Sequence, residues 1–330
     1  MKRAAKETPL TFALLRLLAD GAFHSGQTMA THLGTSRASV HNALREVGMY
    51  GLDLHRVRGR GYRLARPLHW LDEALIKQQL DAAGAAVQLE IVGHASSTNA
   101  MLLQRAALGA ASGSVLAAEW QSAGRGRLGR AWRAGLGDAL TFSLLWRFDG
   151  GLGRLSGLSL AVGVAVLRAL DEIGVHDTGL KWPNDILLGA GKLAGILLEA
   201  QGDMLGPSAV VIGVGLNLRV SASARAAIDQ PVSDLATAGV AAEARNRVFG
   251  ILLIHLLRVM EEFAARGFAA LREEWGAHHA FRQHEIKLSL PDGTGIVGRV
   301  CGVTDEGALR VQTVTGERVF HAGEISLRGV

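Results

Sequence analysis

The spacing of hydrophobic residues predicts three short helices at the N-terminus. Leucines at helical intervals mark one face of a helix that begins after Thr8-Pro9 and ends at Gly21. A second helix begins after Ser25, and a third begins after Thr35 or Ser36. The last two helices have the length and spacing of a helix-turn-helix.

A β-hairpin is predicted directly after these helices. Apolar positions alternate loosely from Leu54 to Leu64 about a turn at Gly59-Arg60-Gly61. A helix-turn-helix followed by such a hairpin is typical of a winged-helix domain.

Beyond Arg66-Pro67 the pattern alternates between helical and strand-like segments. Helices are predicted at Leu71–Ala83, Asn99–Leu108, Leu155–Ile173 and Arg245–Arg266. Strands are predicted at Leu89–Val92, Ser114–Trp120, Leu140–Phe148, Leu193–Leu198 and Val210–Val214. This alternation indicates an α/β body with a mixed sheet.

The C-terminal segment has the alternation of short strands. From His284 to Leu327 apolar residues recur at every second position, with turns at Pro291-Asp292-Gly293 and Asp305-Glu306-Gly307. A small barrel-like β domain is expected there. The whole chain is therefore predicted to be a multidomain α+β protein with domains at 1–66, 67–283 and 284–330.

Composition excludes several classes of protein. The 330 residues are 48% hydrophobic and 20% charged, which suits a folded core and excludes a disordered chain. The single cysteine, Cys301, excludes an internal disulfide and a thiolate zinc cluster. Arg16 interrupts the first apolar stretch, so no signal peptide is expected, and Leu155–Leu167 is too short for a membrane span. We expect a cytoplasmic protein.

Charge is concentrated in the N-terminal domain. Residues 1–66 hold eleven Lys or Arg and four acidic residues, whereas the rest of the chain is nearly neutral. We expect Arg56, Arg58 and Arg60 on the hairpin to contact DNA phosphates. The side chains expected to face the major groove are Ser36, Arg37, Ser39, His41 and Asn42. The alternative is a head that contacts only protein.

An arginine-rich loop lies between two predicted strands of the body. Gln121–Trp132, the arginine loop, contains a formal G-x-G-x-x-G, but a strand follows it instead of a helix, which argues against a dinucleotide site. Its glycines and the charges of Arg125, Arg127 and Arg130 suit a phosphate or carboxylate ligand. A solvated basic loop is the alternative.

Two further motifs carry candidate chemistry. Lys181–Asp185 precedes Lys192–Glu199, in which Lys192 stands at the entrance of an apolar strand. Asp185 is a plausible partner that orients groups or accepts a proton, although a surface ion pair is the commoner explanation. Gly213–Asn217 ends a strand with glycines, where a ligand can approach the backbone.

These motifs, in this order and spacing, resemble those of biotin protein ligases. With the winged helix in front, the chain resembles the bifunctional subclass that is both biotin ligase and biotin operon repressor. The resemblance covers nearly the whole chain, including Ser97-Thr98-Asn99 and Gly323–Arg328. It implies a central domain related to class II synthetase-like folds and a C-terminal SH3-like β-barrel.

The resemblance implies a two-step reaction. Biotin and Mg-ATP give biotinyl-5′-AMP and pyrophosphate, and a lysine of biotin carboxyl carrier protein then takes the biotin. The adenylate also acts as corepressor. The adenylate-bound homodimer binds operator DNA, and this dimer and the carrier protein compete for the same edge of the body sheet.

The resemblance also implies roles for individual residues. The catalytic group would be Lys192, Asp185, Arg125 and Arg127. The biotin site would comprise Ser97, Thr98, Asn99, Gln121, Gly124, Arg125, Gly126, Arg127, Trp132, Lys192 and Gly195. The ATP site would comprise Arg127, Arg130, Trp132, Asn184, Asn217 and Arg328. The sequence does not identify the Mg²⁺ ligands.

One departure from the family concerns adenine. Members of the subclass can place an aromatic side chain after the Gly-x-Asn segment, but 218–248 contains no Phe, Trp or Tyr. Either an aliphatic side chain, Val232 or Leu235, is expected to cover adenine instead, or the loop orders differently. Two rival functions remain open: a transcription factor that only senses biotin, and a lipoate or octanoyl ligase of the same body fold.

Overall fold

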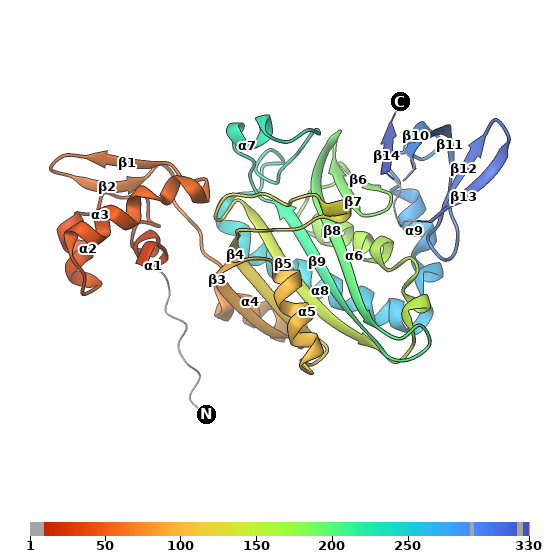
Figure 1. Cartoon of the computed structure of the whole chain (residues 1–330), viewed down its shortest axis with the longest axis horizontal. Helices are drawn as coiled ribbons and strands as arrows, with labels where there is room; N and C mark the ends of the chain where they lie inside the picture. The colour runs from red at the N-terminus through yellow and green to blue at the C-terminus, as the bar shows by residue number, and fades with distance from the viewer. Residues whose placement is uncertain (1–9, 291–293, 322–325, 330) are drawn as a thin grey trace.

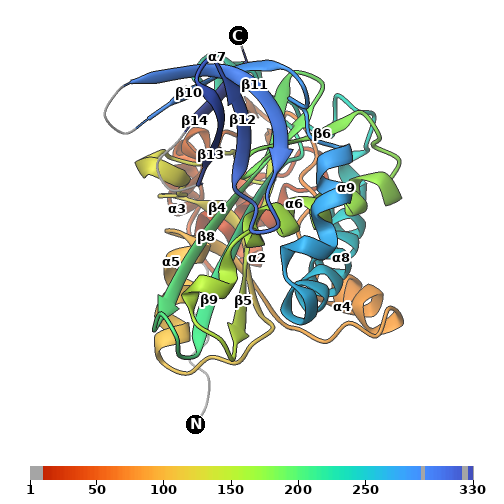
Figure 2. The ribbon, with the colours of Figure 1, turned by 90° about the vertical axis from the view of Figure 1, so that its right-hand side faces the viewer.

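The molecule has three parts arranged in a row. A computed structural model describes residues 10–290, 294–321 and 326–329, and Figure 1 shows the helical head at one end, a large central body, and a small β sheet at the other end. Turned by 90°, the C-terminal sheet lies in front of the body (Figure 2).

The head has the predicted winged-helix order. It comprises α1 (Leu10–Leu17), α2 (Gly26–His32), α3 (Arg37–Arg45), the 3₁₀ turn η1 (Val47–Tyr50), and the hairpin β1 (Leu54–Val57) and β2 (Gly61–Leu64). Ser25 and Ser36 cap α2 and α3, since their hydroxyl oxygens accept backbone N–H groups at Gln27 and Ser39. The predicted cap at Thr8-Pro9 lies outside the described residues, and α1 ends earlier than expected, at Leu17.

The body is built on one seven-stranded sheet. Its strands are β3 (Gln88–Ala95), β4 (Ser114–Gln121), β5 (Ala139–Phe148), β6 (Thr178–Lys181), β7 (Asp185–Leu188), β8 (Gly191–Gly202) and β9 (Ser208–Asn217). Their order is β3-β4-β5-β9-β8-β7-β6, with β3 and β4 parallel and the other neighbours antiparallel. The predicted mixed sheet is confirmed. The sequence pattern missed β6 and β7, because four-residue strands are too short for alternation to be visible.

Helices cover both faces of this sheet. The body helices are α4 (Glu73–Ala82), α5 (Thr98–Ala107), α6 (Leu158–Glu172), α7 (Ala222–Ala226), α8 (Arg245–Arg266) and α9 (Arg272–Ala277). The 3₁₀ turns are η2 (Arg127–Gly129), η3 (Leu152–Leu155), η4 (Ala242–Ala244) and η5 (Phe268–Leu271). Alternation along β5 sends Leu144 into the main core under α6 and α8, and Leu145 into a second cluster under α5.

The helix predicted at Leu155–Ile173 is interrupted. Gly157 has a φ of 79° and separates η3 from α6, and a Cβ atom there would lie 2.4 Å from Phe268. By length and composition alone, Leu152–Glu172 would suffice to cross a membrane. Most of α6 is buried against the sheet and α8, which makes it a core helix of the body.

The C-terminal part is a five-stranded antiparallel sheet. Its strands are β10 (Glu285–Ser289), β11 (Gly295–Val303), β12 (Leu309–Thr313), β13 (Gly316–Phe320) and β14 (Ser326–Gly329), in the order β13-β12-β11-β10-β14. The turn at Asp305–Gly307 is confirmed, and the turn predicted at 291–293 lies outside the described residues. Trp182 joins this sheet to the body by donating its indole N–H to the carbonyl oxygen of Gly307 at 3.1 Å.

The head is packed directly onto the body. Leu136, just beyond the arginine loop, is fully buried in the head's hydrophobic core, and its N–H donates to the Tyr50 carbonyl oxygen at 2.8 Å. The Tyr50 ring meets Trp120 edge-on at 4.8 Å. Arg66 also forms an ion pair with Asp138 of the body. The head therefore packs against the segment that directly follows the arginine loop.

Candidate active site

A large cavity lies on the α5 face of the body sheet. Its volume is about 890 Å³, and the arginine loop, the turn after β6 and the start of β8 all line it. A further segment, the strap (Ala227–Val232), closes one side of the cavity. A cavity of this size suits a drug-sized or nucleotide-sized ligand.

Glycines form the floor of the cavity. A Cβ atom at Gly213 would lie 2.2 Å from Asn99 Oδ1, and one at Gly215 would lie 2.5 Å from the ring of Trp132. A Cβ at Gly195 would come within 3.0 Å of Lys192 Nζ. These three strand positions lack side chains so that larger groups can lie directly on the sheet.

A polar group occupies one part of the cavity wall. Thr98 donates both its backbone N–H and its hydroxyl to Gln121 Oε1, at 2.7 and 3.2 Å. Ser97 caps α5 by accepting the N–H of Ala100, and Ser143 lies behind Thr98, with 2.7 Å between their hydroxyl oxygens. The helix α5 and the end of β4 therefore place donors and acceptors side by side, as recognition of a planar polar ring requires.

Lys192 and Asp185 form an ion pair inside the cavity. Nζ lies 2.7 Å from Asp185 Oδ1, and the two side chains are only 19% and 15% exposed. The backbone of Lys192 is held on both sides, since its N–H donates to Pro231 O at 2.9 Å and its carbonyl accepts from Ser233 N at 3.0 Å. The alternative of an ordinary surface ion pair is wrong for these residues.

The three arginines of the loop have different surroundings. Arg127 is half-buried and donates to Asn184 Oδ1 at 3.1 Å. Burial lowers its pKa, which the Asp185 carboxylate opposes and the positive charge of Arg130 reinforces. Arg130 is exposed at the cavity wall. Arg125 is also exposed and forms an ion pair with Glu199 at 2.8 Å.

Two of the predicted ligand contacts have their side-chain amides engaged within the protein. Asn217 Nδ2 donates to the carbonyl oxygens of Lys192 and Ser233, at 3.3 and 3.1 Å. Asn99 Nδ2 donates to Leu197 O at 3.2 Å and to Glu199 Oε2 at 3.0 Å. Both residues line the cavity and also fix the elements around it.

The remaining predicted site residues differ in where the structure places them. Gly124 and Gly126 lie in the loop, and the loop contains the one-turn η2 instead of an α-helix, as expected of a loop that is not a dinucleotide site. Val232 lines the cavity, but Leu235 is fully buried in the main core and was wrongly expected to reach adenine. Arg328 lies on β14 opposite Lys287, and its side chain lies outside the described part of the chain.

Sequence reasoning missed the strap and Glu199. The strap is anchored by Asp234, which accepts the N–H groups of Val220 and Thr237 and pairs with Arg225 at 3.1 Å. These contacts and burial shift the pKa of Asp234 in opposite directions, and the net result is a lowered pKa. The available signal was the unusual length of the segment between β9 and α8.

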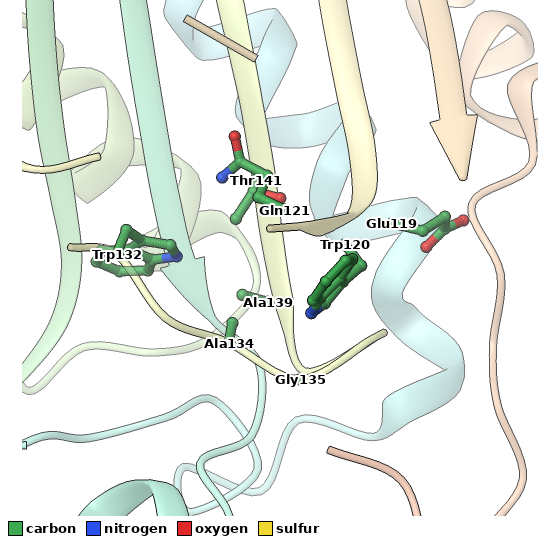
Figure 3. A pocket seen from close by; sticks show the side chains of 8 residues that line it. All are labelled: Glu119, Trp120, Gln121, Trp132, Ala134, Gly135, Ala139 and Thr141. Atoms are coloured by element: carbon green, nitrogen blue, oxygen red, sulfur yellow. The ribbon is translucent and has the colours of Figure 1, made fainter. Parts of the chain in front are cut away.

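A second, very small cavity lies behind Trp132. Figure 3 shows Trp132 and Trp120 on opposite sides of it, with Ala139 and Gly135 between them. Its volume of about 10 Å³ is that of a single water molecule. Within the described residues, the buried indole N–H of Trp132 has no hydrogen-bond partner. The Trp120 side chain lines this cavity and also contacts the Tyr50 ring of the head.

Metal ligands were not predicted from the sequence. Across 10–290, 294–321 and 326–329 there is no group of three or more His, Cys, Asp or Glu side chains placed to hold a metal ion. A Mg²⁺ ion that arrives with a nucleotide is held largely by phosphate oxygens and water.

The head presents a basic surface at the far end of the molecule. Figure 1 shows the turn of the β1–β2 hairpin pointing away from the body. Arg60 stacks on Phe23 at 4.2 Å, and Arg56 lies 5.8 Å from the ring of Tyr62. Arg58 is exposed and stacks on no aromatic ring of the described residues.

The predicted helix residues at this surface differ in exposure. Arg37, Asn42 and Ser36 are exposed. Ser36 and Ser39 share a hydrogen bond of 2.9 Å, and His41 is half-buried with Nδ1 3.3 Å from the Tyr62 hydroxyl. Arg37 and Asn42 are therefore the best placed to reach base edges.

Fold and site together define a ligase-like α/β enzyme body carrying a helix-turn-helix head. Three family models match in order: an "HTH domain" at 10–63, the "Biotin/lipoate A/B protein ligase family" at 94–217, and the "Biotin protein ligase C terminal domain" at 285–328. The chain is 36% identical to the "Bifunctional ligase/repressor BirA" of Salmonella typhimurium, over 98% of this chain and 99% of that protein.

Two further relatives agree. The "Biotin--[acetyl-CoA-carboxylase] ligase" of Mycobacterium tuberculosis is 38% identical over 77% of this chain and 95% of that protein. The structure "Biotin protein ligase from Aquifex aeolicus in complex with biotin and ATP" aligns with a TM-score of 0.63 and 26% identity, over 74% of this chain and 99% of that one. The chain belongs to the bifunctional ligase/repressor family of biotin protein ligases.

Proposed function

We propose that this protein attaches biotin to a lysine of a biotin carboxyl carrier protein, using ATP and a biotinyl-5′-AMP intermediate. The observation that carries the proposal is the half-buried Lys192–Asp185 pair, which faces Arg127 within one cavity of about 890 Å³. That cavity combines a polar recognition wall, a glycine floor and fixed positive charge.

The polar wall would bind the biotin ring system. Ser97, Thr98 and Gln121 offer hydroxyl and amide groups to the two polar edges of the ureido ring. Trp132 lies over Gly215 and would pack on the apolar part of the ligand. The ligand carboxyl group would then point towards Lys192.

Lys192 would act in the first step. The biotin carboxylate attacks the α-phosphorus of ATP, a new C–O–P bond forms, and the bond to pyrophosphate breaks. Like charges approach in this step, so Lys192, Arg127 and Arg130 would stabilise the transition state. Asp185 keeps Lys192 in place through the 2.7 Å ion pair.

Asp185 would act again in the second step. The incoming lysine of the carrier protein must be neutral, although its unperturbed pKa is about 10.4. Asp185 would accept its proton while the amide bond forms and AMP leaves. Asn184, Asn217 and Arg328 are proposed on the ATP side, with Val232 against adenine.

A competing function is ligation of lipoate or octanoate on the same fold. The hydrogen-bonding wall at Thr98 and Gln121 favours biotin, because an alkyl chain leaves those groups unsatisfied. ATP–pyrophosphate exchange in the presence of biotin, octanoate or neither tests the proposal. Exchange with biotin alone is expected; exchange with octanoate instead, or with neither acid, contradicts it.

We further propose that the head binds operator DNA and represses biotin synthesis genes. The domain limits 1–66, 67–283 and 284–330 fit this division, and the matched head model ends at residue 63. β8 extends beyond β7, so in the described chain 197–202 pair with a strand, β9, on one side only. This sheet edge would form the adenylate-linked homodimer or meet the carrier protein, in the cytoplasm. Sedimentation with and without biotin and ATP tests the dimer.

A further inference from the structure

We infer that Arg125 and Glu199 form a clasp that holds the arginine loop closed over the cavity, with Glu199 as a positioning residue that retains the adenylate. The inference rests on the proposed function for the identity of the retained molecule. The clasp itself is defined by geometry: Arg125 Nη2 lies 2.8 Å from Glu199 Oε2, across 74 positions of sequence.

Within the described residues, side chains fix the loop tip to the sheet. Its backbone hydrogen bonds are internal: Gly126 N donates to Arg130 O at 2.7 Å, and Trp132 N donates to Gly124 O at 2.9 Å. Leu128 adopts a φ of 55°, which is unfavourable for a residue with a side chain. Side chains must therefore join the tip to the sheet: Arg127 does so at Asn184, between β6 and β7, and the Arg125–Glu199 pair joins the tip to β8.

The buried side chain of Asn99 holds Glu199 in position. Its Oε2 accepts a hydrogen bond from Asn99 Nδ2 at 3.0 Å, and Asn99 is only 4% exposed. Ordinary surface ion pairs contribute little because two mobile side chains must be ordered. The Glu199 carboxylate is already ordered by the buried Asn99 amide. Formation of the ion pair therefore costs mainly the side-chain entropy of Arg125.

The same buried contacts reach the proposed ureido site. Asn99 Oδ1 accepts from Ser143 Oγ at 2.6 Å, and Ser143 lies 2.7 Å from Thr98 Oγ1, which in turn contacts Gln121. Gln121 is the first residue of the arginine loop. One chain of polar contacts thus connects the clasp at the loop tip to the recognition wall at the loop base.

The arginines of the loop have different partners. All three arginines line the cavity, but Arg125 pairs with the Glu199 carboxylate on the neighbouring strand, whereas Arg127 donates to the amide oxygen of Asn184. An open loop exposes the reactive mixed anhydride to water and lets it diffuse away. Closing the loop is therefore the contribution expected of Arg125 and Glu199.

The test compares three variants of the full chain. Glu199→Gln keeps the size of the side chain and an oxygen for Asn99 but removes the charge that holds Arg125. The double variant Arg125→Glu with Glu199→Arg restores an ion pair of reversed polarity. Glu317→Gln is the matched control, because Glu317 pairs with Arg310 at 2.7 Å on the surface of the C-terminal sheet.

Release of preformed labelled biotinyl-5′-AMP into an unlabelled chase is the main measurement. Glu199→Gln should release it about tenfold faster than the unsubstituted chain and Glu317→Gln, and the gap should narrow as salt screens the pair. The double variant should recover most of the retention. Equal release by Glu199→Gln and Glu317→Gln, or a double variant that recovers nothing while melting like the parent, overturns the clasp.

Trypsin cleavage without ligand separates this inference from the proposed function. Glu199→Gln should be cut faster within the arginine loop than the parent chain and Glu317→Gln. If the parent forms no adenylate, the proposed function fails, and cleavage alone still decides the clasp. Equal cleavage rates in all three chains would contradict it.

Discussion

At the residue scale, the proposed reaction depends on one lysine that the backbone holds in place. Lys192 is the second residue of β8; its N–H bonds Pro231 in the strap, and its carbonyl bonds Ser233 directly after the strap. Its ammonium group is thus fixed before substrate arrives, which is the condition for charge stabilisation without reorganisation.

Lys192→Ala should slow single-turnover adenylation by about 10²-fold or more, because charge develops between carboxylate and phosphate only in the transition state. Biotin binding, measured by calorimetry, should weaken much less than the rate falls. Lys77→Ala is the control, since Lys77 is an exposed residue of α4 paired with Glu73. An unchanged rate in Lys192→Ala would remove this residue from the mechanism.

His279 predicts a pH dependence of stability. Burial lowers its pKa from 6.5 to about 4, with a smaller contribution from His284, and within the described chain neither ring nitrogen has a hydrogen-bond partner. The unfolded chain therefore takes up a proton more readily than the folded one as the pH falls below 6.5. This stabilisation is present at neutral pH and is lost between pH 6.5 and 4, at a cost on the order of 3 kcal/mol.

Urea unfolding between pH 4 and 7 measures this effect. The unsubstituted protein should lose more stability over that range than His279→Gln, and the difference between the two chains isolates this residue from other titrating groups. Parallel curves for the two chains would contradict the assignment.

At the element scale, the hairpin and helix α3 of the head should differ in their contribution to DNA binding. The hairpin arginines are proposed to contact phosphates, which every sequence presents equally, whereas residues of α3 are proposed to reach base edges. Arg58 is the exposed hairpin arginine least engaged with aromatic rings, so it gives the cleanest test.

Arg58→Gln should weaken binding to promoter DNA and random DNA alike and lower the salt slope by about one unit. Asn42→Ala should instead change the preferred sequence. Mobility shifts at several salt concentrations, with biotin and ATP present, measure both effects. If the intact protein shows no salt-dependent DNA binding, the head is a stabilising or protein-contacting domain.

At the scale of the whole molecule, the head and the active site share a wall. Leu136 is buried in the head core directly after the arginine loop, and Trp120 lies between Tyr50 and the small cavity behind Trp132. Removal of the head would expose these apolar groups and release one border of the loop.

Deleting 1–66 should abolish operator binding and retain part of the ligase activity, because the proposed chemical groups all lie beyond Arg66. Biotin and adenylate should bind more weakly, because Leu136 loses the Tyr50 carbonyl and its apolar surroundings. Tyr50→Ala in the full chain is the matched variant, since it removes the ring against Trp120 and keeps the backbone bond. Unchanged biotin affinity in the deletion would show that the two parts are energetically independent.

Local patterns determined much of this protein. Helical spacing and the serine caps were sufficient for α2 and α3, and apolar runs were sufficient for β4, β5, β8 and β9, because these elements are long enough or capped clearly enough to be read from neighbours in sequence. The arginine loop and Lys192 were also visible, since glycine and fixed charge in a strand connection are informative by themselves.

Only the tertiary structure decided which of those residues meet. The 2.7 Å pair of Lys192 with Asp185, the contact of Arg125 with Glu199, and the burial of Leu235 away from the cavity all depend on strand order and on which face a side chain takes. The strands β6 and β7 and the junction of Tyr50 with Leu136 are likewise products of packing between distant segments. Sequence spacing determines which residues share a face of one helix or strand. Contacts between helices and strands depend on how the whole chain buries its apolar surface.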